Sequence, residues 1–166
     1  MDAIRERSDC IAMVEPASNE TFLGSSHPVE VDWEETWEAG RRIVRRTLHT
    51  PMGDLTSTLE TVPGIQTTWT TEHWCKTPED VDRALSIPYE PLSYDPAEVH
   101  RVRGEVGDRG IVMTSIADGL LLAAELMEFG EFTVWATAEP EHFERTLWML
   151  HERNLENLGR MLEADV

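Results

Sequence analysis

Two carboxylates and two hydroxyls of this chain directly follow apolar runs, in positions where side chains can do chemistry. Glu15 follows the run CIAMV, which has the composition of a short buried strand. Thr114, Ser115 and Asp118 follow a second such run, GIVM. The carboxyl ends of parallel strands are where barrel proteins assemble their active sites. We therefore interpret the two carboxylates as catalytic candidates and the two hydroxyls as substrate-binding candidates.

These candidates also have structural interpretations. Asp118 stands just before an expected helix and can cap it, and Glu15, next to Pro16, can be a solvated loop acid. Glu72 and His73 in TTEHW could form another polar pair within reach of a ligand, with His73 as the substrate-binding candidate. Side chains alternate between the faces of a strand, so one of the two is expected at the surface. A proton relay between them is not expected.

Residues 41–62 predict an antiparallel β-hairpin. Two β-prone runs flank the turn TPMG, in which proline fixes φ and glycine can take a left-handed conformation. We expect residues 43–49 to pair with residues 55–61 and a run at 67–74 to add a third antiparallel strand. Residues 17–40, after the short strand at CIAMV, are expected to be mainly loop, with a short strand at Val29–Trp33.

A group of four arginines lies on the first strand of this hairpin. Arg41, Arg42, Arg45 and Arg46 could form an anion site. At this spacing on a strand they do not converge on one point. The spacing therefore favours a solvated face, paired with acids such as Glu60.

Beyond Thr77 the sequence changes to helical patterns with acids and prolines at the expected helix starts. A strand followed by a helix is typical of an α/β protein. The expected elements are helices at 77–85 and 95–107, a buried strand at 109–116, an apolar helix at 117–130 ended by Gly130, and a long helix at 139–165.

The long helix carries an apolar stripe that we expect to pack against a sheet. In α/β proteins such a helix leads into another parallel strand, and the chain ends at Val166, where that strand would begin. The stripe consists of Leu147, Trp148, His151, Leu155, Leu158 and Leu162. We expect one incomplete domain over residues 1–166, made of an irregular part at 1–40, a hairpin region at 41–76 and a βα segment with helices at 77–166.

Charge and composition restrict the classes of function. The chain has 166 residues, with 32 acidic against 14 basic residues and a net charge of −18. This charge disfavours nucleic-acid binding, although an acidic decoy for basic partners stays an alternative. No apolar stretch is long enough for a membrane span, and a cytoplasmic location is expected. Cys10 and Cys75 are too far apart in sequence for a CxxC metal pair and are interpreted as free thiols.

The order of several segments resembles the uroporphyrinogen decarboxylase superfamily, nearest its branch of cobamide-dependent methyltransferases and their relatives. The resemblance spans roughly residues 28–166 and covers an amino-proximal part of a family member. It is carried by RRTLHTPMGDLT, TTWTTEHWCKTPEDVDRALSIPYEP, GIVMTSIADGLLLAAELMEFG and EPEHFERTLWMLHERNLENL.

The resemblance implies a (β/α)8 barrel, here a partial one with an inserted antiparallel hairpin, and a tetrapyrrole or methyl donor as small-molecule substrate. The decarboxylases hold the pyrrole nitrogens with an aspartate after the first strand, and Glu15 is its nearest counterpart. Ala124 stands where they carry a tyrosine, and their amino-terminal arginine motif is missing from residues 1–9. The zinc or cobamide of the methyltransferases would belong to the full-length form, and no cofactor is expected within this chain.

The resemblance thus predicts a fragment of a barrel enzyme, of the decarboxylase or methyltransferase type, that is inactive alone. The alternative is a non-catalytic acidic module that binds a partner or self-associates. A fragment would expose sheet edges and an apolar helix stripe, whereas an evolved short form would carry polar caps.

Overall fold

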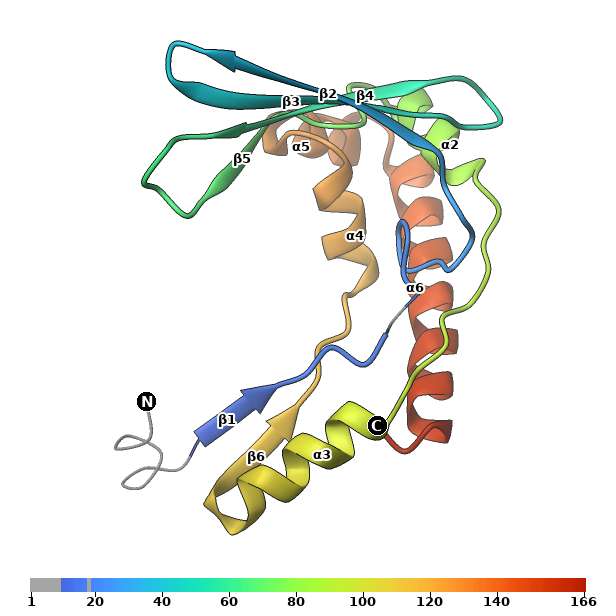
Figure 1. Ribbon diagram of the computed structural model, residues 1–166. Coiled ribbons are helices and arrows are strands. Elements are labelled where there is room, and N and C mark those ends of the chain that lie inside the picture. The colour runs from blue at the N-terminus through green and yellow to red at the C-terminus, as the bar shows by residue number, and fades with distance from the viewer. Residues whose placement is uncertain (1–9, 18) are drawn as a thin grey trace.

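The computed structural model describes residues 10–17 and 19–166 as a mixed α/β structure with two separate sheets (Figure 1). A four-stranded antiparallel sheet lies at one end of the molecule and a two-stranded parallel sheet at the other. The long helix α6, Pro140–Glu163, runs between these ends, and α4, Gly119–Leu126, packs against it. The expected mixed α/β character is confirmed, and the described residues close no barrel.

The antiparallel sheet forms where the turn chemistry predicted it. Its strands, in spatial order, are β2 Val31–Glu38, β3 Arg41–Leu48, β4 Leu55–Thr61 and β5 Thr68–Glu72. Gly53 has a φ of 112°, and its N–H donates to the Thr50 carbonyl at 3.1 Å. The hairpin and the third strand are therefore confirmed.

The strand β2 is longer than the predicted strand at Val29–Trp33. Its eight residues pair with all of β3. Cross-strand ion pairs explain the extension, because Glu35 accepts from Arg42 at 2.7 Å and Glu38 from Arg45 at 3.1 Å.

The arginines of β3 are paired rather than convergent. Arg41 forms an ion pair with Glu60 at 2.5 Å, as the sequence suggested. Arg46 instead donates to Ser57 Oγ at 2.7 Å and stacks over Trp74, with 4.6 Å from its Cζ to the ring centroid. Arg41, Arg42 and Arg45 are paired with acids as interpreted, although strand alternation places Arg42 on the opposite face from the other two.

The parallel sheet joins two segments that are 100 residues apart. The strand β1, Cys10–Met13, pairs in parallel with β6, Gly110–Met113. The helix α3, Ala97–Val106, continues into the 3-10 turn Gly107–Arg109 and contacts both strands. The side chains pointing to the other face are exposed, namely Ile11, Met13, Ile111 and Met113.

The apolar helix predicted at 117–130 is wrong in its second half. α4 ends at Leu126, because Met127 forms a parallel bridge with Cys75. The side chain of Glu128 then caps a new helix, α5, Phe129–Ala138. The helix α2, Pro78–Leu85, begins as predicted, with a capping box between Thr77 and Asp80.

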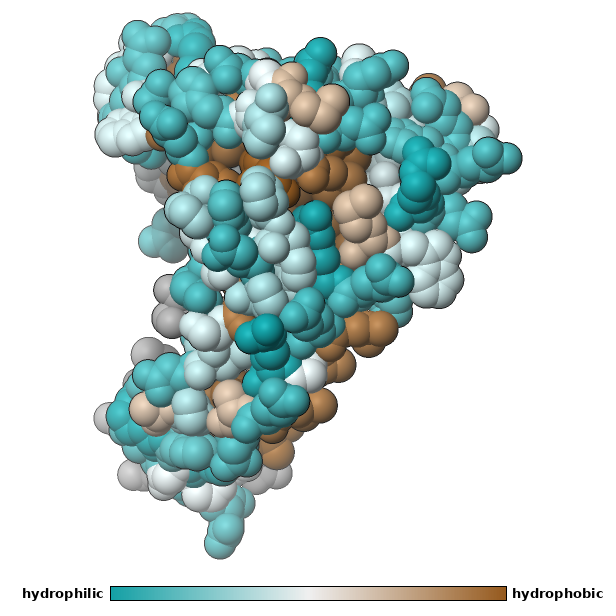
Figure 2. Space-filling model, turned by 90° about the vertical axis from the view of Figure 1, so that its right-hand side faces the viewer, coloured by the Kyte–Doolittle hydropathy of each residue, from teal (hydrophilic) through white to brown (hydrophobic). Residues whose placement is uncertain are grey.

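The predicted orientation of the long helix is also wrong. Trp148, Leu155 and Leu162 of the expected packing stripe are 59%, 53% and 66% exposed. Figure 2 looks onto the side of the molecule where α6 lies and shows apolar side chains at the surface along one margin. The buried positions of α6 are Thr146, Leu150, Asn154, Asn157 and Met161. Polar contacts of the two asparagines, described below, hold this other face inward.

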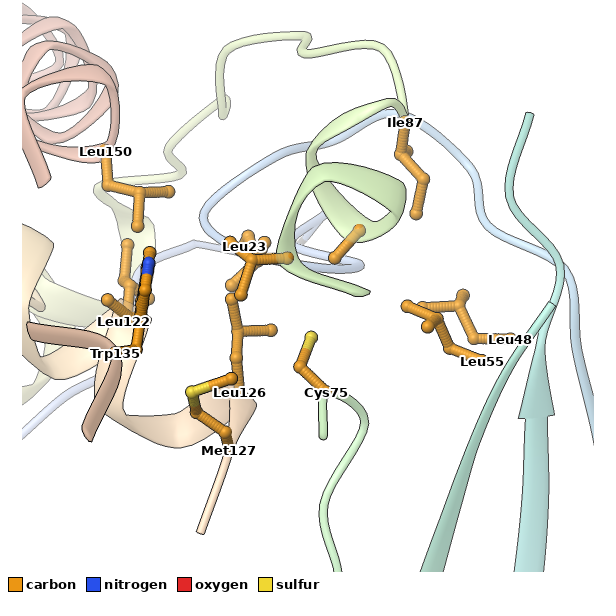
Figure 3. Packing of buried hydrophobic residues seen from close by; sticks show 13 residues of the cluster. Leu23, Leu48, Leu55, Cys75, Ile87, Leu122, Leu126, Met127, Trp135 and Leu150 are labelled. Carbon is orange, nitrogen blue, oxygen red and sulfur yellow. The ribbon is translucent and has the colours of Figure 1, made fainter. Parts of the chain in front are cut away.

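The hydrophobic core lies between the antiparallel sheet, α2 and the helices α4 to α6. Figure 3 shows Cys75 between Leu126 and Met127 on one side and the cross-strand pair Leu48 and Leu55 on the other. All five side chains are at most 3% exposed. The remaining cluster members are Leu23, Val81, Ala84, Ile87, Leu122, Ala123, Trp135 and Leu150.

A half-buried histidine beside the hairpin turn makes the stability of the fold depend on pH. His49 lies between two carboxylates, with Nε2 at 3.0 Å from Asp32 and Nδ1 at 2.8 Å from Asp54. Hydrogen bonds to Asp32 and then Asp54 raise the pKa of His49 from 6.5 to about 9. A raised pKa means that the charged ring stabilises the folded chain fully below pH 6.5, and that this stabilisation is lost as the pH rises through 9.

We expect an NMR titration of the His49 ring to give a pKa of about 9. The double variant Asp32→Asn and Asp54→Asn should return this pKa toward 6.5 and flatten the dependence of unfolding free energy on pH between these values. Asp108→Asn is the control, because Asp108 lies in the turn after α3. A wild-type pKa near 6.5 would contradict the charged interaction.

Candidate functional site

Two of the four sequence-predicted residues that follow β1 and β6 touch one another. Ser115 Oγ donates to Glu15 Oε1 at 2.9 Å. The Val14 N–H donates to the Met113 carbonyl at 2.9 Å, which carries the pairing of the two strands one residue beyond their ends. The parallel register therefore brings together two groups that are 100 positions apart in the sequence.

A cavity of about 190 Å³ lies next to this pair. Polar groups line much of it, while apolar side chains such as Leu92, Ile116 and Leu122 form the rest. Burial, and then the charge of Glu20, raise the pKa of Tyr94, so its phenol keeps its proton at neutral pH. The polar lining residues are Glu15, Glu20, Tyr94, Ser115, Asn154 and Asn157.

The asparagines of α6 shape this cavity by binding backbone groups. Asn157 Nδ2 donates to the Gly24 carbonyl at 2.7 Å, and its Oδ1 accepts from the Leu92 N–H at 2.9 Å. Asn154 Nδ2 donates to the Ala117 carbonyl at 2.7 Å. The sequence reasoning missed both residues, although two asparagines three positions apart lie on one helix face and are weak helix formers.

The other predicted site residues do not line the cavity. Thr114 Oγ1 is buried and has no hydrogen-bond partner in the described part of the chain. Asp118 accepts from the Leu121 N–H at 2.7 Å, so it caps α4 as the structural alternative proposed. His73 lies beyond β5, where its Nδ1 is 3.4 Å from the Glu125 carbonyl. The structure thus unites Glu15 with Ser115 but leaves Asp118 and His73 elsewhere.

A second, shallower hollow of about 470 Å³ lies on the antiparallel sheet. Its acid Glu72 accepts from Thr56 at 2.9 Å and Thr58 at 2.7 Å and forms an ion pair with Lys76 at 2.9 Å. Hydrogen bonds from Lys76 and then Thr58 lower the pKa of Glu72 to about 2. Because two threonines of β4 and Lys76 already satisfy this carboxylate, the hollow is the weaker candidate.

The described residues contain neither a group of metal ligands nor a helix suited to cross a membrane. Burial raises the pKa of Cys75 to about 12, so this core thiol does not supply a thiolate. Across residues 10–17 and 19–166, no three His, Cys, Asp or Glu side chains are grouped to hold a metal ion. The donor set therefore does not fit the thiolate zinc site that the resemblance implies. No helix within these ranges has both the length and the apolar character needed to cross a bilayer.

Comparisons with family models, curated proteins and solved structures found no match.

We predict that Asn157→Ala strongly destabilises the fold and the cavity wall. The Asn157 side chain is buried, and its loss leaves the Leu92 N–H and the Gly24 carbonyl without this partner. Two unsatisfied backbone groups cost roughly 2–4 kcal/mol. Urea unfolding followed by circular dichroism measures the loss. The exposed neighbour Glu152, changed to alanine, should shift stability by less than about 0.5 kcal/mol, and equal shifts in both variants would contradict the role of Asn157.

Proposed function

We propose that this chain forms an amino-proximal βα portion of a (β/α)8-barrel enzyme. Its cavity, where β1 and β6 end, would bind part of a small-molecule substrate. The observation that carries the proposal is the Ser115–Glu15 hydrogen bond of 2.9 Å at the adjacent carboxyl ends of two parallel strands. Barrel enzymes assemble their active sites from this edge. The resemblance adds the reaction class, a decarboxylase or a cobamide-dependent methyltransferase.

The uncovered face of the parallel pair supports an incomplete barrel. Parallel sheets are normally covered on both faces, yet Ile11, Ile111 and Met13 are 64%, 56% and 57% exposed. In the part of the chain that the structure describes, this sheet contains two strands. Further parallel strands would cover these side chains and extend the edge that carries Glu15.

The cavity lining favours a ligand that donates hydrogen bonds. Glu15 and Glu20 are acceptors, and neither lysine nor arginine is among the described residues that line the cavity. Pyrrole N–H groups suit such a lining, whereas the carboxylates of a tetrapyrrole would need cations from elsewhere. At about 190 Å³ the cavity is smaller than the roughly 300–1,000 Å³ of typical ligand pockets. It would therefore hold one ring or one end of a larger substrate.

Glu15 would accept hydrogen bonds from the substrate, and Ser115 would hold the Glu15 carboxylate in place. Tyr94, unlike the carboxylates, would donate a hydrogen bond to the substrate through its phenol. A catalytic role for Asp118 and substrate-binding roles for Thr114 and His73 stay predictions. They would require loops or ligands that approach the carboxyl edge from outside the cavity.

A second candidate function is self-association. The specific observation is the exposed apolar face of β1 and β6, because apolar patches of this kind mark contact sites. A chain that associates through this face should bind a hydrophobic dye or elute as an oligomer. A monomer that unfolds in one sharp transition without dye binding would contradict both the incomplete barrel and the self-associating chain.

The chain alone should turn over neither uroporphyrinogen nor a methylcobamide with a thiol acceptor, because the cavity offers few of the groups such reactions need. It should nevertheless bind a dipyrromethane that lacks carboxylate groups, measured by NMR titration. Glu15→Gln should weaken that binding roughly tenfold, since charge-assisted hydrogen bonds contribute about 1.5–3 kcal/mol.

The exposed Glu141 of α6 provides the matched control. Glu141→Gln should leave the affinity for the dipyrromethane unchanged. Absence of binding, or equal effects of the Glu15 and Glu141 substitutions, would reject the site. Turnover that falls in Asp118→Ala would instead reject inactivity of the chain and make Asp118 catalytic.

A further inference from the structure

One side of α6 presents apolar residues at a spacing that suits another helix. Positions 148, 151, 155, 158 and 162 recur at alternating intervals of three and four residues. This is the spacing of a helix-pairing seam. Trp148, Leu155 and Leu162 of this seam are more than half exposed, and His151 is exposed as well. We call these five positions the α6 seam.

An apolar groove of about 350 Å³ lies at the amino-terminal end of the seam. Leu120 of α4, 53% exposed, and Leu147 and Trp148 of α6 form its apolar lining. The rings of Trp148 and His151 meet edge to face, with centroids 5.6 Å apart. A bulky apolar side chain from a partner could enter between α4 and α6 here.

Acidic residues border the groove and the seam. Asp118 and Glu144 line the groove, and the exposed Glu152 lies one turn beyond Trp148. In the described residues, neither Glu144 nor Glu152 forms an ion pair. The stretch from Gly110 to Glu144 contains no lysine or arginine, and the exposed Arg145 follows it on α6. Its acids are Asp118, Glu125, Glu128, Glu131, Glu139, Glu141 and Glu144.

We propose that the groove and the α6 seam bind an amphipathic helix of another protein, with apolar residues facing α6 and lysine or arginine residues along its flanks. An apolar helix face laid into a groove is a common recognition mode, and the flanking charges select the partner. A second copy is the poorer occupant, because it would bring the same acids and another net charge of −18. This surface is independent of the proposed enzymatic role.

Two designed helical peptides test the proposal with the full chain. Each has about 21 residues with leucine at the a and d positions of a heptad. One carries lysine at e and g, and the other carries glutamate there. Fluorescence anisotropy should show that the lysine peptide binds at least roughly tenfold more tightly. The difference should shrink in about 0.5 M NaCl, where charges are screened beyond a few ångströms.

Substitutions on the protein locate the binding surface. Trp148→Ala should weaken binding of the lysine peptide by tenfold or more, as truncation of a central aromatic anchor does. The similarly exposed Trp37 of β2, at 62% against 59%, gives the control Trp37→Ala, which should not change affinity. Circular dichroism and urea midpoints verify that both surface variants fold.

Reversal of the bordering charge tests the chemistry of the partner. The double variant Glu144→Lys and Glu152→Lys should prefer the glutamate peptide, whereas Glu34→Lys on the sheet should keep the wild-type preference. Equal binding of both peptides, or a preference unchanged by the double variant, would overturn the proposal. Dimerisation in sedimentation velocity that Trp148→Ala abolishes, and that the lysine peptide does not compete, would overturn it in favour of a second copy.

Discussion

The arrangement of the helical part depends on the buried side chain of Asn157. Its amide binds the Gly24 carbonyl and the Leu92 N–H, so two stretches distant in sequence attach to one position of α6. Gly24, with φ of 67°, lies close enough that an added Cβ would be 3.5 Å from Asn157 Nδ2. One turn earlier, Asn154 attaches the Ala117 carbonyl. Because buried polar groups must be paired, these bonds fix the face of α6 that turns inward.

This constraint explains why apolar residues of α6 are left outside. A helix buries one face, and here that face contains Thr146, Asn154 and Asn157 beside the apolar Leu150 and Met161. α4 packs so tightly on α6 that a Cβ at Gly119 would lie 2.8 Å from the Leu147 carbonyl. With these backbone contacts in place, Trp148 and Leu155 point away from the core. Specific polar pairing has therefore overridden the hydrophobic pattern of the helix.

The difference between local and distant interactions decides which features the sequence predicted. The hairpin around Gly53 and the helix start at Thr77 were predicted correctly, because turn and cap chemistry lie within a few residues. The apolar run at 117–130 gave no sign of a break, since the break depends on the bridge between Cys75 and Met127. The inward face of α6 was mispredicted for the same reason.

The residues of the candidate site show the same difference between local patterns and distant contacts. Glu15 and Ser115 could be predicted as site candidates because each follows an apolar run, and the structure joins them by one hydrogen bond. Asp118 could be recognised as either a cap or a catalytic acid, and its bond to the Leu121 N–H supports the cap. The contributions of Asn154, Asn157 and Tyr94 could not be predicted, because they come from elements whose packing no local pattern specifies.

The short connection from β6 to α4 ties these features together. Within it, Ser115 binds Glu15 at the cavity, the Ala117 carbonyl is held by Asn154, and Asp118 caps α4. Two residues further, Leu120 forms part of the apolar groove beside α6. A displacement of α6 would pull on Ala117 through Asn154, and the same peptide segment carries Ser115. Because the Asn154 contact and the Ser115 contact lie in this one connection, the packing of α6 and the geometry at the carboxyl edge of the parallel strands depend on the same few residues.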